Sequence, residues 1–109
     1  GNRHDVEVTV SKSTPPSPVS DTSGLAYTQV TAAISSVYPD VRPRAVLLSG
    51  GTDTKHFTDV AQCCIRFTPM VFTPEQTATI HGIDENIDCA ALPSGVDFFK
   101  TLIEHRSNR

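Results

Sequence analysis

Apolar residues recur at intervals of three and four in two stretches of the chain. Over residues 21–37 the apolar stripe is formed by Ala26, Val30, Ala33, Ile34 and Val37. After residue 88 a second stripe is formed by Leu92, Val96, Phe99, Leu102 and Ile103. This spacing places each set on one helix face, so the pattern predicts two amphipathic helices. Ser20 or Asp21 can cap the first helix, and Asp88 can cap the second.

Three shorter stretches have the features of β-strands. Residues 6–10 alternate valine with polar side chains, which is typical of a strand with one buried face. Residues 44–48 are nearly all apolar, as expected for a strand that is covered on both faces. Residues 63–67 are predicted to form a further strand. A helix over residues 54–61 is predicted between these last two strands.

The order of the elements predicts the fold class. Thr52 or Asp53 can cap the helix between the strands, and the loop after the second strand has room for one helical turn after Pro74. Two strands separated by a helix imply a parallel pair with a right-handed crossover. We therefore predict an α/β fold, with a partial three-layer sheet in α-β-α-β-α order. Because two or three strands make a poor sheet on their own, we expect further strands outside this chain.

A Pro-rich stretch divides the chain into two parts. Residues 13–20 contain three prolines, each of which removes a backbone donor and fixes φ. We therefore read residues 1–20 as a strand followed by a Pro-rich connection, and residues 21–109 as the α/β unit.

Length and charge exclude several classes of function. The chain has 109 residues, enough for one domain, and a formal net charge of −3. Its sequence has no basic stripe interleaved with aromatic residues, so we expect no nucleic-acid partner. Its apolar runs are too short to cross a bilayer, so we expect no membrane partner. Its cysteines, Cys63, Cys64 and Cys89, are odd in number and are read as small packed hydrophobes.

Two loops contain candidate functional residues. His81 lies in an Ile-His-Gly segment with Glu85 close behind, and imidazole is a common metal ligand that a nearby carboxylate can orient. The alternative is a structural or solvent-exposed histidine. The Gly-Gly-Thr-Asp stretch, residues 50–53, lies where a strand is predicted to end and a helix to begin, and backbone N–H groups there favour an anion. The alternative is an ordinary capped turn.

The combined order of these motifs resembles a known enzyme family. Gly-Gly-Thr-Asp-Thr-Lys-His-Phe is followed by Ile-Arg-Phe-Thr-Pro, then Ile-His-Gly-Ile-Asp-Glu-Asn-Ile, then Gly-Val-Asp-Phe-Phe-Lys-Thr-Leu-Ile. This order resembles the C-terminal end of M20-family zinc metallopeptidases, in the carboxypeptidase S and N-acyl-amino-acid hydrolase branch. The resemblance covers residues 21–104. It implies that residues 1–20 are the exit from an inserted lid domain, through which the parent enzyme could form a homodimer.

The resemblance also implies a chemistry and a set of residues. Such enzymes hold two zinc ions, and their substrates here would be peptides or N-acyl amino acids. It implies that His81 is a zinc ligand, that Glu85 has a supporting role, and that Gly51, Thr52 and Asp53 contact substrate. It assigns no catalytic residue to this chain. The remaining ligands and the general base belong to motifs that are absent here, so we expect the chain alone to be inactive and to bind zinc weakly at most.

Two departures and two rival interpretations remain. Lys55 stands where this branch usually has Arg, and it cannot make the same bidentate contact. Asp84 stands where Asn is usual. The rivals are a stand-alone small α/β binding or interaction module, and a family member that keeps the scaffold without its chemistry. The first interpretation requires the remainder of the catalytic domain as a partner, whereas a stand-alone module does not. Motifs encoded upstream of this chain would separate an active enzyme from a member without its chemistry.

Overall fold

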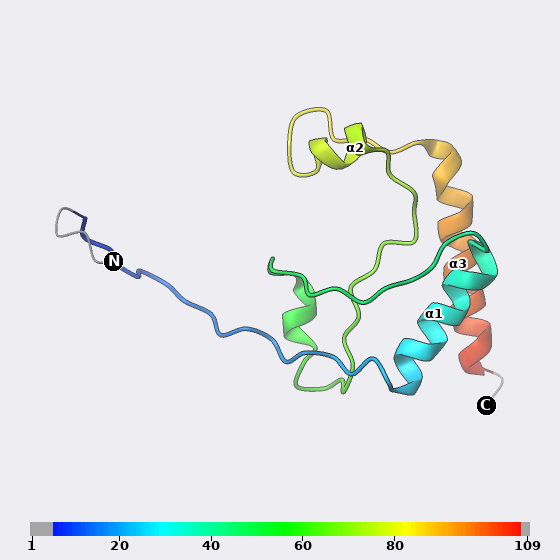
Figure 1. Ribbon diagram of the computed structural model, residues 1–109, viewed down its shortest axis with the longest axis horizontal. Coiled ribbons are helices and arrows are strands. Elements are labelled where there is room, and N and C mark those ends of the chain that lie inside the picture. Colours follow the sequence, from blue (N-terminus) through cyan, green and yellow to red (C-terminus); the bar gives the residue numbers. More distant parts are fainter. Residues whose placement is uncertain (1–5, 108–109) are drawn as a thin grey trace.

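The fold of the chain is helical (Figure 1). A computed structural model describes residues 6–107. Its elements, in chain order, are α1 (Leu25–Val37), the 3-10 helix η1 (Asp53–His56), α2 (Pro74–Thr79), the 3-10 helix η2 (Cys89–Ala91) and α3 (Leu92–Ser107). Residues 6–19 extend away from the helices as an arm.

The core lies between α1 and α3, the two long helices. Ala33 and Ile34 from α1 and Phe98 from α3 are buried. The ring of Phe67 packs against the ring of Phe98, with their centroids 5.2 Å apart. Four half-buried side chains surround this cluster: Val30, Val37, Tyr38 and Leu102. The predicted stripe is therefore confirmed as the face that α1 presents to the core, except for Ala26, which is exposed.

The segment before α2, which contains Pro69 and Met70, packs against both α1 and α3. The Tyr38 hydroxyl donates a hydrogen bond of 2.8 Å to the Pro69 carbonyl oxygen. A Cβ on Gly95 would lie 3.0 Å from that same oxygen and 3.3 Å from Cγ of Met70. Only a residue without a side chain lets α3 come this close to the segment.

The α/β prediction is wrong for this structure. Residues 6–10, 44–48 and 63–67 have no regular secondary structure, and within the residues that the structure describes no strand forms. A strand exists only where another backbone supplies hydrogen-bond partners, and an apolar sequence pattern does not supply one. The apolar run 44–48 is accordingly exposed, with Val46 and Leu47 at 85% and 81%. The Cα radius of gyration is 18.2 Å, well above the roughly 13 Å of a compact chain of this length.

The predicted capping of the first helix is also wrong. The helix begins at Leu25, four residues later than expected, and its N-cap makes no side-chain hydrogen bond. Asp21 instead accepts hydrogen bonds of 2.8 Å from the backbone N–H and the hydroxyl of Ser23, which hold the pKa of its carboxyl below the usual value. Ser20 instead bonds the backbone of Cys64, accepting from its N–H at 2.8 Å and donating to its carbonyl at 2.9 Å.

The last helix forms where the pattern predicts it, but it buries a different face. Of the predicted stripe, only Leu102 is half-buried, and four residues are exposed: Leu92, Val96, Phe99 and Ile103. The buried positions of α3 are Gly95 and Phe98. The side chain of Asp88 makes no capping hydrogen bond. A broad apolar surface on α3 therefore faces solvent, because α1 covers only one edge of it.

The two short helices differ in how well the sequence predicts them. The helix expected over residues 54–61 is a single 3-10 turn, Asp53–His56, although its cap is confirmed because Thr52 Oγ1 accepts from the Thr54 N–H. The turn expected after Pro74 is confirmed as α2.

Candidate functional site

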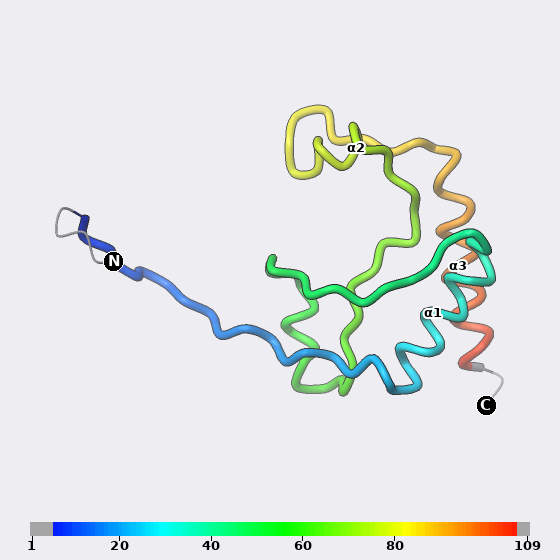
Figure 2. Tube along the Cα trace, viewed as in Figure 1, coloured from blue at the N-terminus to red at the C-terminus, as the bar shows by residue number. Residues whose placement is uncertain are grey.

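His81 lies in a tight loop that follows α2. Figure 2 shows the chain turning back on itself just beyond that helix. His81 and Asp84 both have positive φ values, 62° and 60°. Residues other than glycine rarely adopt this left-handed backbone conformation. It costs about 1–3 kcal/mol per residue and persists only where the surrounding structure holds it. His81 is exposed to solvent, so its imidazole is accessible.

Side-chain hydrogen bonds hold this loop in place. The carboxylate of Glu85 accepts from the backbone N–H of His81 at 3.2 Å. The side-chain amide of Asn86 donates to the carbonyl of Asp84 at 2.6 Å. Gln76, a buried side chain on α2, in turn donates to Asn86 Oδ1 at 3.3 Å. Each left-handed residue therefore has its own backbone hydrogen bond to a neighbouring side chain.

Sequence reasoning alone missed Gln76 and Asn86. The signal for Gln76 was present, because Thr73-Pro-Glu-Gln has the spacing of a capping box. The structure forms that box, with Gln76 N–H donating to Thr73 Oγ1 and Thr73 N–H donating to Gln76 Oε1. No comparable pattern marks Asn86, since its hydrogen bonds depend on how the loop folds.

The described residues do not fit a complete zinc site. Within residues 6–107 no three His, Cys, Asp or Glu side chains gather closely enough to hold a metal ion. The Glu85 carboxylate is engaged by the His81 backbone, and the three cysteines are free thiols. His81 offers one imidazole, whereas a catalytic zinc takes three protein ligands. A zinc centre using His81 requires ligands from elsewhere, and no chemical step through zinc can be derived from this chain.

The candidate substrate loop, residues 50–53, is open and anchored at one end. Nothing lies within 4 Å of where a Cβ would stand on Gly50 or Gly51. At the other end, Thr52 Oγ1 accepts from Arg66 Nε at 2.9 Å. Asp53 is exposed at the start of η1. Arg66 is a residue that sequence reasoning left without a role, and the structure places its guanidinium against this loop.

The two candidate loops do not meet in this structure. Among the described elements, η1 makes no contact with α2, the helix that leads into the His81 loop. Figure 1 shows the two elements at separate places in the molecule. The predicted metal ligand and the predicted substrate contacts are therefore each presented to solvent, without forming one pocket.

Thr52→Val should loosen the substrate loop. The substitution keeps the shape of the side chain but removes the oxygen that accepts from Thr54 and Arg66. Loss of the cap should cost about 1 kcal/mol, which is roughly a fivefold faster amide exchange at Thr54 in the 109-residue chain. Thr22→Val, at an exposed threonine, is the control and should leave that exchange unchanged. Equal exchange in both variants would show that Thr52 does not hold the loop.

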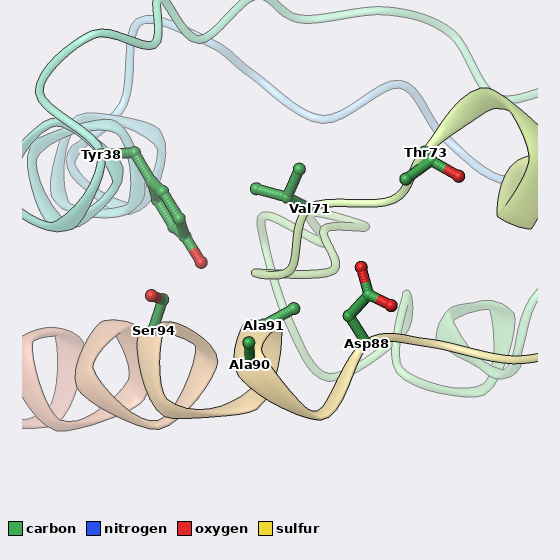
Figure 3. Close-up of a pocket in the computed structure, with 7 residues that line it drawn as sticks. All are labelled: Tyr38, Val71, Thr73, Asp88, Ala90, Ala91 and Ser94. Atoms are coloured by element: carbon green, nitrogen blue, oxygen red, sulfur yellow. The ribbon is translucent and has the colours of Figure 1, made fainter.

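A separate hollow lies between α1, the start of α3 and the segment before α2 (Figure 3). Its volume is about 270 Å³, and it is lined by Tyr38, Val71, Thr73, Asp88, Ala90, Ala91 and Ser94. Tyr38 stands at one end, and Asp88 faces the segment that carries Val71. None of the predicted site residues lines this hollow, so it does not join the two candidate loops.

Comparison with known proteins identifies the family. The sequence pattern of Peptidase family M20/M25/M40 matches residues 4–105, nearly the whole chain. The chain therefore belongs to this family, and the resemblance seen in the order of its motifs is confirmed. No helix among the described residues is long and apolar enough to cross a membrane. No solved structure gives a significant match to the chain.

The chain is also similar to individual members of the family. It is 36% identical over 93 residues to the N-fatty-acyl-amino acid synthase/hydrolase PM20D1 of Homo sapiens, covering 83% of this chain and 18% of that protein. It is 31% identical over 90 residues to the probable carboxypeptidase S-like 2 of Dictyostelium discoideum, covering 83% and 17%. A putative carboxypeptidase of Saccharomyces cerevisiae is 30% identical, covering 76% and 16%. The chain thus spans less than a fifth of the length of these three relatives.

Proposed function

We propose that this chain is part of the catalytic domain of a longer zinc-dependent hydrolase, which cleaves a peptide bond or the amide bond of an N-acyl amino acid. The match to the peptidase family over residues 4–105 carries the proposal. The named relatives include carboxypeptidases and an N-fatty-acyl-amino acid synthase/hydrolase. Substrates of both kinds have an amide bond next to a free carboxylate, and we propose this class for the longer protein.

In this proposal His81 is the one metal ligand that the chain supplies. Its exposure and its fixed backbone support the assignment, because an imidazole needs access and a set direction to complete a site built from other segments. The chain's own contribution is to present His81 and to hold the loop with Glu85.

The proposal gives residues 50–53 a substrate-binding role. Gly51 leaves room for a ligand to approach the backbone, and Thr52 is fixed from behind by Arg66. Asp53 and Lys55 are exposed beside them and offer opposite charges. We propose that the remainder of the catalytic domain brings this loop close to His81.

Exposed apolar surface supports the need for that remainder. The exposed apolar residues of α3 form one face along the helix, and those of residues 44–48 are consecutive in the sequence. Apolar surface of this kind on a soluble protein usually marks a contact site. We propose that the rest of the catalytic domain covers both, so that the chain alone is inactive.

Hydrolysis by the longer protein is the direct test. Purified protein should release free amino acid from an N-acyl amino acid or a dipeptide, and a chelator should abolish the release until zinc is restored. The 109-residue chain, assayed in parallel and examined by native mass spectrometry with modest zinc excess, should show neither turnover nor tightly held metal. A longer protein that is folded and zinc-loaded but hydrolyses neither substrate class would refute the proposal. Two zinc ions held tightly by the short chain would refute the proposal that most zinc ligands come from the rest of the protein.

A further inference from the structure

Gln76 is the described side chain that is both polar and buried, with 7% of its surface exposed. A buried amide carries an energetic cost unless its donors and acceptor are hydrogen-bonded. Its oxygen accepts from Thr73 N–H at 3.0 Å and its nitrogen donates to Asn86 Oδ1 at 3.3 Å. One side chain therefore joins the first turn of α2 to the loop that follows the helix, ten residues further on.

The connection continues from Asn86 to the strained part of the loop. Asn86 uses its oxygen toward Gln76 and its amide nitrogen toward the carbonyl of Asp84, at 2.6 Å. Asp84 is one of the two non-glycine residues with positive φ, and His81 is the other. The short turn between them is closed at its other end by the bond from the His81 N–H to Glu85. The orientation of His81 is thus tied to a buried group that lies outside the loop.

We propose that Gln76 is a positioning residue for His81. Acting through Asn86, it stabilises the left-handed turn in which the imidazole is held outward. The inference rests on the proposed role of His81 as a metal ligand. A ligand fixed before the metal binds loses less conformational freedom on coordination than one on a mobile loop. The capping box alone does not account for Gln76. The box uses the backbone N–H and the side-chain oxygen of Gln76, but it does not use the side-chain nitrogen that bonds Asn86.

One substitution can cut the connection while keeping the helix cap. In Gln76→Glu the carboxylate still accepts from the Thr73 N–H, and both Glu and Gln are typical of that position in a capping box. The donor to Asn86 is lost. If the Asn86 amide turns to donate to the new carboxylate, the Asp84 carbonyl loses its partner instead, so the connection is broken in either arrangement. The matched control is Thr73→Ala, which weakens the cap but leaves the Gln76 amide intact.

The readout is NMR of the 109-residue chain. In the unsubstituted chain, the 13Cα and 13Cβ shifts of His81 and Asp84 should have left-handed values. Gln76→Glu should shift both toward ordinary values and speed His81 amide exchange about threefold to tenfold, the effect of one hydrogen bond, while the α2 shifts stay constant. Thr73→Ala should speed exchange within α2 more than at His81. Ordinary shifts at His81 and Asp84 in the unsubstituted chain, or unchanged values in Gln76→Glu, would overturn the proposal.

A kinetic measurement separates this inference from the proposed function. In the longer protein, Gln76→Glu should lower kcat with KM nearly unchanged and weaken zinc retention about tenfold, as loss of support behind a metal ligand does. A purely structural role would instead lower the folded fraction and leave kcat per folded molecule at its normal value, which would count against positioning. If the longer protein has no hydrolase activity, the proposed function fails, while the NMR result still decides whether Gln76 fixes the loop.

Discussion

His81→Ala in the longer protein should lower kcat by more than about a hundredfold. Loss of residues that merely support a metal ligand costs about 10- to 100-fold in affinity or activity, so loss of the ligand itself should cost more. The effect should be seen in kcat and in zinc content together. His81 is exposed and its side chain makes no hydrogen bond within residues 6–107, so the fold should tolerate alanine there.

The matched control is His105→Ala. His105 lies on α3 and, like His81, is exposed. This variant should retain full activity and full zinc content. Metal content measured by mass spectrometry of the intact protein and kcat measured on the same preparation settle the comparison. A His81→Ala protein that keeps both zinc ions and normal turnover would remove His81 from the metal site.

The sequence predicts the local elements better than their assembly. The stripe of α1 and the turn after Pro74 depend on local periodicity and on one proline, and both are confirmed. The cap at Thr52 is also local, since its acceptor serves an N–H two residues away. Features of this kind need no information from distant parts of the chain.

Most of the failed predictions depend on partners, although the capping of the first helix and the length of the helix after Thr52 are local predictions that also fail. The run 44–48 reads as a buried strand because it is apolar, but burial and pairing both require neighbours that the described residues do not provide. The prediction of the buried face of α3 fails for the same reason. The apolar stripe is broad enough for two contacts, and the sequence cannot show that α1 takes only the edge with Gly95 and Phe98.

The candidate site shows the same division. His81 and Glu85 are predicted from a motif, and the structure adds that Glu85 bonds the His81 backbone. The Gln76–Asn86 and Arg66–Thr52 hydrogen bonds join side chains 10 and 14 residues apart, and these pairings depend on how the loops fold. Whether His81 binds zinc and whether residues 50–53 contact substrate remain predictions, because both depend on groups outside this chain.

Phe98→Ala should unfold the α1–α3 pair of the 109-residue chain. Phe98 is 2% exposed and is the largest side chain in a cluster whose other buried members are Ala33 and Ile34. Replacing a buried Phe with Ala costs about 3–5 kcal/mol, and so small a core has no comparable reserve. Helical content measured by circular dichroism should therefore fall sharply, with no cooperative transition left on adding urea.

Phe99→Ala is the control, because it removes the same number of atoms from the next position. Phe99 is 52% exposed and its ring lies edge-on to that of Phe98, with centroids 5.3 Å apart, so the short chain should lose only about 1 kcal/mol. In the longer protein the two variants should become similar, since the proposed remainder of the domain covers the face of α3 that carries Phe99. Equal tolerance of Phe98→Ala and Phe99→Ala in the short chain would show that this core does not hold the helices together. A Phe99→Ala variant that remains harmless in the longer protein would mean that nothing covers the face.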